Sequence, residues 1–295
     1  MPQVTGIYPP IVTPFDSSGA IDWAALDANL CRWNETGLAG YVVAGSNGES
    51  ASLTPDEIVT LTARVRLGAA PGMRVIAGTG RQSTQETIAL TREAAAVGAD
   101  LTLVMTPSFF AEQMTAPALM AHYQRVADAS PIPVLLYNVP KYTNVNIVPG
   151  LAAALAAHPN IVGLKDSSGN ITQMIGLLRA CPPDFSLLVG NGGAFFSAVS
   201  VGASGGVLAL ANVAPLECVQ VLADVRSGNT AAAQELAFRL IPVNAAVTST
   251  YGVPGLKAAL DLLGYAGGAP RLPLLPLGET ARADIAQILA TAGLR

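Results

Sequence analysis

Lysine is rare in this chain, and one lysine lies where it can act as a nucleophile. Among the 295 residues there are three lysines, Lys141, Lys165 and Lys257. Lys165 ends the apolar segment 161–165, whose side chains disfavour a charged ammonium group. A neutral lysine amine is a nucleophile suited to carbonyl carbons, with which it can form a Schiff base. The alternative is a lysine at the end of a strand whose amine simply reaches solvent.

Other polar residues also lie where apolar segments end. Tyr137 ends segment 134–137, and its phenol can pass protons to and from a Schiff-base intermediate, unless it is only an aromatic residue at a rim. Ser46 and Asn47 lie in a glycine-flanked turn after segment 40–44. Such a turn suits a carboxylate through its N–H groups, unless it is an ordinary turn. Asp166 follows Lys165, and strand alternation turns it to the other face, so we expect a structural role.

The sequence predicts neither a metal site nor a cofactor. The two histidines, His122 and His158, are far apart, and the three cysteines, Cys31, Cys181 and Cys218, lack close spacing. There is no G-x-G-x-x-G after the first apolar segment and no G-x-x-x-x-G-K-[ST] in the chain. We expect the cysteines to be reduced thiols and the protein to be cytoplasmic.

The composition favours a large apolar core. Hydrophobic residues make up 51% and charged residues 12% of the chain, and the mean hydropathy is +0.44. The most apolar stretch, 198–225, is interrupted by glycine, proline and polar residues, so no membrane span is predicted. The first residues show no signal-peptide pattern. A net charge of -4 without a basic tract argues against nucleic acid as a partner.

Short apolar segments alternate with helical patterns along the chain. They lie at 6–13, 40–44, 74–78, 100–105, 134–137, 161–165, 186–189 and 206–210. Their nearly continuous apolar character is typical of parallel strands covered on both faces. Eight such units predict an α/β fold, a (β/α)8 TIM barrel, whose chemistry lies at the carboxyl ends of the strands. A doubly wound open sheet is the competing architecture, but it would need a phosphate-binding loop at its first turn.

Helix signals fill the spaces between the apolar segments. Thr54, Pro55 and Glu57 form a capping-box pattern, and Ser83 with Glu86 repeats it. After residue 211 the pattern becomes purely helical. We therefore expect a catalytic barrel over 1–211 and a helical region over 212–295 packed on it.

Three motifs give the chain a resemblance to a known family. GSNGES at 45–50, YNVP at 137–140 and GLKDSSGN at 163–170 occur in this order at the ends of the expected strands. With them, nearly the whole chain resembles the dihydrodipicolinate synthase and N-acetylneuraminate lyase family of pyruvate-dependent aldolases. Within this family it is most similar to 4-hydroxy-2-oxoglutarate aldolase, through Ser46-Asn47, PIPVLLY, HPNIVGLKDS and the stretch from Asn244 to Lys257.

The resemblance implies roles for the candidate residues. Lys165 would form the imine with the 2-oxo carbon, and Tyr137 would donate and accept protons. Ser46 and Asn47 would hold the substrate carboxylate. Family members use neither a metal ion nor an organic cofactor, act on pyruvate or a related 2-oxo acid, and are commonly homotetramers built as dimers of dimers.

Two further family positions match and two depart. Ser167 and Gly190 would line the pocket. The synthases carry an arginine two residues beyond YNVP, where this chain has Tyr142. They also carry a tyrosine after the fourth strand, where this chain has Phe109 and Phe110. Both departures count against synthesis of dihydrodipicolinate.

The leading hypothesis is a Schiff-base lyase, a class I pyruvate-dependent aldolase that cleaves or forms a carbon–carbon bond in a 2-oxo acid, with 4-hydroxy-2-oxoglutarate as the expected substrate. The alternatives are dihydrodipicolinate synthase, a dehydratase of 2-oxo-3-deoxy sugar acids, and a protein that only binds a 2-oxo acid.

Overall fold

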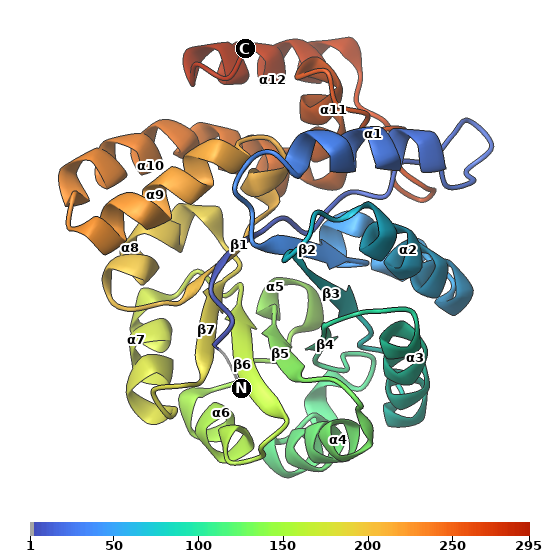
Figure 1. The fold of residues 1–295 in the computed structure, drawn as a ribbon, viewed down its shortest axis with the longest axis vertical. Coiled ribbons are helices and arrows are strands. Elements are labelled where there is room, and N and C mark those ends of the chain that lie inside the picture. The colour runs from blue at the N-terminus through green and yellow to red at the C-terminus, as the bar shows by residue number, and fades with distance from the viewer. Residues whose placement is uncertain (1–2) are drawn as a thin grey trace.

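The computed structural model describes residues 3–295 and contains a sheet of eight parallel strands rolled into a barrel (Figure 1). The strands run in the order β1-β8-β7-β6-β5-β4-β3-β2. The ring closes between β1 and β2 through a parallel bridge of Pro10 with Val42, whose N–H donates to Pro9 O at 2.9 Å. This confirms the predicted TIM barrel. The strands are β1 Gly6–Tyr8, β2 Gly40–Val43, β3 Arg74–Gly78, β4 Leu101–Met105, β5 Val134–Asn138, β6 Ile161–Asp166, β7 Ser186–Val189 and β8 Gly205–Val207.

Helices surround the barrel, and further helices follow β8 at the top of the view in Figure 1. Seven helices lie between successive strands from β2 onward: α2 Pro55–Gly68, α3 Thr84–Ala96, α4 Ala116–Ala129, α5 Pro140–Thr143, α6 Pro149–Ala156, α7 Ile171–Ala180 and α8 Phe195–Ser200. The others are α1 Trp23–Trp33, between β1 and β2, and α9 Pro215–Ser227, α10 Thr230–Ala245, α11 Gly252–Leu262 and α12 Glu279–Thr291, after β8. The division of the chain at 211/212 stays a prediction.

The capping patterns of the sequence explain where two of these helices begin. Thr54 Oγ1 accepts from Glu57 N at 3.2 Å, and Glu57 Oε2 accepts from Thr54 N at 2.9 Å, so the predicted capping box is present. At α3, Ser83 Oγ accepts from Glu86 N at 3.4 Å, which is the first half of such a box.

The first and last strands differ from their predicted ranges. We predicted a strand over 6–13, but β1 ends at Tyr8, because Pro9 and Pro10 have no N–H to extend a ladder. We predicted the last strand over 206–210, but β8 runs from Gly205 to Val207, and a 3₁₀ turn begins at Ala209.

Alternation along the strands separates an inner from an outer apolar layer. One cluster fills the barrel, and it contains Tyr8, Val42, Ile76, Leu103, Leu135, Tyr137 and Leu188. Their strand neighbours, such as Val43, Leu136 and Leu164, pack in a second cluster with the helices. Lys165 pairs in register with Tyr137 and with Leu188, so its side chain belongs to the inner layer.

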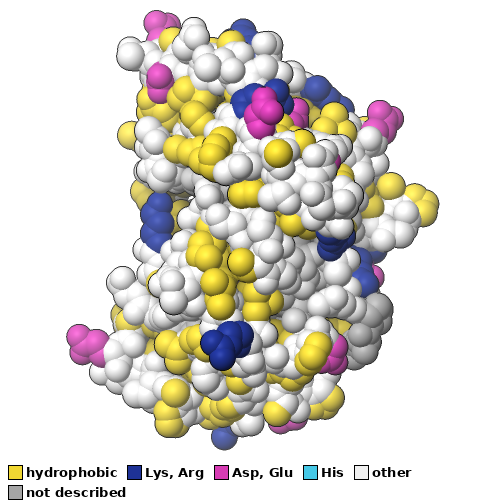
Figure 2. Space-filling view, turned by 90° about the vertical axis from the view of Figure 1, so that its left-hand side faces the viewer, with side chains coloured by type: hydrophobic (Ala, Val, Ile, Leu, Met, Phe, Trp, Pro, Cys, Tyr) yellow, Lys and Arg dark blue, Asp and Glu magenta, His cyan; other side chains and the backbone are white. Residues whose placement is uncertain are grey.

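The surface carries apolar and charged side chains in small groups. Figure 2 views the molecule from the left-hand side of Figure 1, where α7 to α10 lie, and basic side chains stand separately on this face. Within residues 3–295, no helix is long and apolar enough to cross a membrane.

Candidate active site

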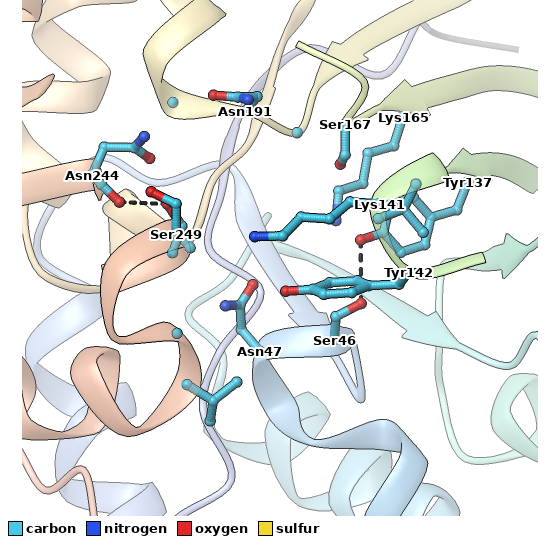
Figure 3. Close-up of a pocket in the computed structure, with 17 residues that line it drawn as sticks. Ser46, Asn47, Tyr137, Lys141, Tyr142, Lys165, Ser167, Asn191, Asn244 and Ser249 are labelled. Carbon is cyan, nitrogen blue, oxygen red and sulfur yellow. Dashed lines mark hydrogen bonds between the residues drawn. The ribbon is translucent and has the colours of Figure 1, made fainter. Parts of the chain in front are cut away.

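A cavity of about 170 Å³ opens at the carboxyl ends of the strands (Figure 3). Its wall includes all six residues that we selected from the sequence: Ser46, Asn47, Tyr137, Lys165, Ser167 and Gly190. They come from the loops or strand ends of β2, β5, β6 and β7, which the barrel brings to the same edge. Their catalytic and binding roles stay predictions.

Lys165 is buried but is not held by an acid. Its side chain is 3% exposed, and its Nζ lies 3.9 Å from the centre of the Tyr137 ring. No ion pair of residues 3–295 includes Lys165. A reaction of this amine with a carbonyl group therefore has no ion pair to break.

Tyr137 lies beside Lys165 and within reach of a second hydroxyl. Its Oη is 3.3 Å from Ser46 Oγ, and either atom can be the donor. Burial acts to raise the pKa of Tyr137, but the charge of Lys165 and hydrogen bonds with Ser46, Lys165 and Ser167 outweigh it. The pKa of Tyr137 is therefore below its ordinary value, which suits a group that both donates and accepts a proton.

The turn that carries Ser46 and Asn47 is tightly wound. Gly48 N donates to Gly45 O at 3.0 Å, and Glu49 N donates to Ser46 O at 3.2 Å. Glu49 then adopts a left-handed conformation with φ of 58°. The turn places the Ser46 and Asn47 side chains at the cavity, where Figure 3 shows both pointing toward its open space.

An ion pair that we did not predict fixes this turn from behind. Glu49 is 4% exposed, and its Oε1 lies 2.6 Å from Lys257 Nζ on α11. Lys257 also donates to Thr13 O at 2.9 Å and to Ala269 O at 2.8 Å. Glu49 Oε2 accepts from Arg271 N at 2.8 Å. The region after β8 thus holds the loop on which two predicted binding residues lie.

Gly190 and Ser167 pack against each other beside Lys165. Gly190 N donates to Asp166 O at 2.7 Å, which draws the end of β7 toward β6. A Cβ at position 190 would overlap Ser167 Oγ and lie 3.0 Å from Lys165 Cε. Position 190 therefore needs glycine so that the Lys165 side chain and the Ser167 hydroxyl can share this corner of the cavity.

Asp166 stands behind the site, as expected from strand alternation. It is fully buried, and its Oδ1 accepts from Asn138 Nδ2 at 3.1 Å and from Ser168 N at 2.8 Å. Its Oδ2 accepts from Ser168 Oγ at 3.0 Å. These bonds join the ends of β5 and β6, which carry Tyr137 and Lys165.

Sequence reasoning missed part of the cavity wall. Asn191 and Asn244 line the cavity, as do Thr248 and Ser249 from a π-helical turn over Ala246–Thr250. Asn244 Oδ1 is buried and has no hydrogen-bond partner within the described chain. The stretch around Asn244 contributed to the resemblance, but no strand end marked it as part of a site. A π-helical turn is itself a frequent sign of a functional position.

The residues that differ from those of the synthases lie in two different places. Lys141 and Tyr142 line the cavity. Phe109 and Phe110 do not; they are 79% and 64% exposed, and their rings meet edge to face at 4.9 Å between centroids.

The histidines take part in structural contacts. His122 Nδ1 lies 2.9 Å from Thr84 Oγ1, and burial lowers the pKa of His122 to about 4. His158 Nε2 lies 3.0 Å from Asp128 Oδ1. Within residues 3–295, no three His, Cys, Asp or Glu side chains are grouped as metal ligands would be.

Comparison with known proteins gives consistent results over the whole chain. Residues 3–292 match the family described as the Dihydrodipicolinate synthetase family. A 4-hydroxy-tetrahydrodipicolinate synthase from Methanothrix thermoacetophila is 37% identical over 96% of this chain and 95% of its own length. The enzyme of the same name from an Exiguobacterium species is 36% identical, with 95% of each chain covered.

Solved structures agree in fold. The dihydrodipicolinate synthase of Acinetobacter baumannii, described as a complex with pyruvate, superimposes with a TM-score of 0.94 at 31% identity and covers 99% of this chain and 100% of its own. The synthase of Thermotoga maritima gives a TM-score of 0.93, also at 31% identity and with the same coverage of both chains. These relatives bear the name of our second candidate activity and not that of 4-hydroxy-2-oxoglutarate aldolase.

Proposed function

Because this chain belongs to the dihydrodipicolinate synthetase family and is a Schiff-base-forming, metal-independent lyase, we propose that its own reaction is the cleavage of 4-hydroxy-2-oxoglutarate into pyruvate and glyoxylate, with the reverse addition. Pyruvate is the partner common to the family's reactions, and a solved relative is described as a pyruvate complex.

The first half of the reaction makes the imine. The Lys165 amine attacks C2 of the substrate while Ser46 and Asn47 hold the C1 carboxylate. Tyr137 donates a proton to the hydroxyl of the resulting carbinolamine, and water leaves. The product is an iminium ion that can accept an electron pair from the neighbouring carbon.

The second half breaks the C3–C4 bond. The C4 hydroxyl gives its proton to Tyr137, C4 becomes the carbonyl of glyoxylate, and the bonding electrons move to the iminium to form an enamine. Protonation of C3 and hydrolysis of the imine then release pyruvate. Ser167 shares a hydrogen bond with Tyr137 and supports this proton transfer.

Our choice of substrate rests on the charged residues of the cavity wall. The lining residues of the described chain include two lysines, Lys141 and Lys165, and no aspartate or glutamate. Aspartate semialdehyde and 4-hydroxy-2-oxoglutarate each bring a carboxylate beyond the imine, but aspartate semialdehyde also brings an ammonium group that would meet no carboxylate in this wall. Tyr142, at the position of the synthases' arginine, offers a hydroxyl without charge.

Condensation of pyruvate with aspartate semialdehyde is the second candidate. It is supported by the names of the curated relatives at 36–37% identity. Both reactions start from the same imine, so family membership does not choose between them.

Purified protein should be assayed for cleavage of 4-hydroxy-2-oxoglutarate and for condensation with aspartate semialdehyde. We expect kcat/KM for cleavage to exceed kcat/KM for condensation by roughly 30-fold or more. The reason is that Tyr142 stands where the synthases carry a charged arginine. A condensation rate equal to or above the cleavage rate would reverse the proposal. If both are negligible while pyruvate and borohydride still label Lys165, dehydration of sugar acids or binding alone becomes the better proposal.

We also propose that the protein works as a homotetramer in the cytoplasm. The exposed aromatic pair Phe109 and Phe110 supports an interface on this surface, because monomers rarely expose adjacent large aromatic side chains. Light scattering coupled to gel filtration would give the mass directly, and a monomer mass would contradict this.

A further inference from the structure

We infer that Lys141 selects dicarboxylic substrates by binding the carboxylate that lies farthest from the imine. The inference rests on the proposed function for the name of the substrate, but not for the binding itself. Lys141 lines the cavity, and Figure 3 shows its side chain extending toward the same open space as Asn47 and the Tyr142 hydroxyl.

The backbone that carries Lys141 is fixed on both sides. Lys141 lies on the short helix α5, which follows directly after the strand that ends with Tyr137 and Asn138. Thr143 Oγ1 donates to Val139 O at 3.3 Å and to Val145 O at 3.1 Å. Asn144 N donates to Pro140 O at 2.9 Å and closes the helix in a left-handed conformation. These hydrogen bonds fix the position from which the Lys141 side chain extends into the cavity.

Lys141 has no acidic partner of its own. It takes part in no ion pair of residues 3–295, and its Nζ lies 5.7 Å from the centre of the Tyr142 ring. An amine at the mouth of a cavity without carboxylates is available to an anion that enters it.

The charges balance for one class of substrate. Once Lys165 has formed the iminium, its positive charge is matched by the C1 carboxylate near Ser46 and Asn47. Lys141 then remains as the second positive charge in the wall, and a second carboxylate neutralises it. The neutral amides and hydroxyls of Asn244, Thr248 and Ser249 complete the wall and suit a hydroxyl such as that on C4.

The test uses two five-carbon 2-oxo acids that differ only at the far end. 2-Oxoglutarate ends in a carboxylate and 2-oxopentanoate ends in a methyl group, and neither has a C4 hydroxyl, so neither undergoes the cleavage. Imine formation at Lys165 is measured as the concentration that gives half-maximal borohydride trapping, read by mass spectrometry. Pyruvate is trapped in parallel.

For Lys141→Met we expect the half-saturating concentration of 2-oxoglutarate to rise roughly 10-fold, the effect of one charge-assisted hydrogen bond. The values for 2-oxopentanoate and pyruvate should change less than about threefold, because these ligands lack the far carboxylate. Lys141→Arg should retain the preference for 2-oxoglutarate, since it keeps the charge. Arg125→Met, which removes an exposed charge on α4 away from the cavity, is the matched control and should change nothing.

Equal weakening of all three ligands in Lys141→Met would show a structural role and overturn the inference, as would an unchanged 2-oxoglutarate value. If the wild-type protein prefers 2-oxoglutarate through Lys141 but does not cleave 4-hydroxy-2-oxoglutarate, the inference stands and the proposed function fails.

Discussion

Lys165 and Lys257 occupy similar surroundings and have different partners. Both side chains are almost fully buried, at 3% and 1% exposure. The Nζ of each lies above an aromatic ring, 3.9 Å from the centre of Tyr137 for Lys165 and 4.5 Å from the centre of Phe15 for Lys257. Lys257 has Glu49 and two carbonyl oxygens around it, whereas Lys165 has the hydroxyl group of Tyr137.

Burial alone therefore does not distinguish the two lysines, and their partners do. Lys257 donates all three of its ammonium protons, to a carboxylate and two carbonyl oxygens, and the pair with Glu49 opposes the lowering of the Lys257 pKa by burial. Lys165 has no such counter-charge within residues 3–295, so its amine can react with a carbonyl without first breaking an ion pair. Four substitutions test this contrast.

Lys165→Ala should abolish the reaction. Loss of the atom that forms the covalent bond is expected to lower kcat/KM by at least about 10⁴-fold, because no other group can take its place. Borohydride with pyruvate should then label no residue, whereas the wild-type protein is labelled on the peptide with Lys165. Label on Lys257 or Lys141 in the wild type would refute the assignment.

Lys257→Met should cost stability instead of the covalent step. It leaves the buried Glu49 carboxylate without its cation, and we expect the free energy of unfolding to fall by about 3–5 kcal/mol in urea titrations. Protein that remains folded should still trap pyruvate on Lys165. The double variant Lys257→Met with Glu49→Gln should recover more than about 1 kcal/mol, because it removes the unpaired charge. A double variant no more stable than Lys257→Met would mean that Glu49 is not the cause.

Tyr137→Phe gives Lys165 a phenylalanine ring as its neighbour, as Lys257 has in Phe15. The packing is kept and the hydroxyl is lost, so kcat should fall roughly 100-fold through loss of proton transfer, while the label on Lys165 persists. The lowered pKa of Tyr137 places its deprotonation below the ordinary tyrosine range. The alkaline limb of the kcat/KM profile should therefore lie below pH 10 in the wild type and disappear in the variant. A variant within threefold of the wild type would exclude Tyr137 from the relay.

Glu57→Gln tests a weaker contact near Lys257. Arg271 donates to both carboxylate oxygens of Glu57. These hydrogen bonds lower the pKa of Glu57 against the opposing effect of burial. A lowered pKa in the folded state gives stability that is present above about pH 4.5 and is lost as the pH falls through the folded value.

The variant should therefore lose less stability than the wild type between pH 6 and 3. The difference should be at most about 1 kcal/mol, as for other partly exposed ion pairs. Glu93→Gln, on the exposed face of α3, is the control and should follow the wild type. Identical acid unfolding of Glu57→Gln and the wild type would contradict the prediction.

Much of the fold could be predicted because its signals are local. Apolar strands with both faces covered recur at regular intervals, and helix caps such as Thr54 mark the starts between them. The errors lie where local rules compete. The prolines at 9 and 10 end β1 early, although the apolar pattern continues to residue 13.

The predicted site residues all lie at or just after the carboxyl ends of strands, and a barrel brings those ends together whatever the details of its packing. The Glu49–Lys257 pair and the Asn244 wall depend instead on how helices after β8 fold back on the barrel. No spacing in the sequence reports that contact. The sequence pattern around Lys257 is equally typical of a lysine on a helix whose amine reaches solvent. It therefore did not predict that Lys257 pairs with a buried carboxylate.

The contacts of Glu49 also impose an order in time. Arg271, whose N–H binds Glu49, lies 222 positions later in the chain. A ribosome that adds about 5–20 residues per second needs roughly ten to forty-five seconds to synthesise that span. Throughout this interval Glu49 has emerged while Lys257 and Arg271 have not, so the turn with Ser46 and Asn47 lacks what holds it. Most residues of the cavity are thus made early, but the contacts that hold the turn with Ser46 and Asn47 can form only after residues 257–271 have left the ribosome.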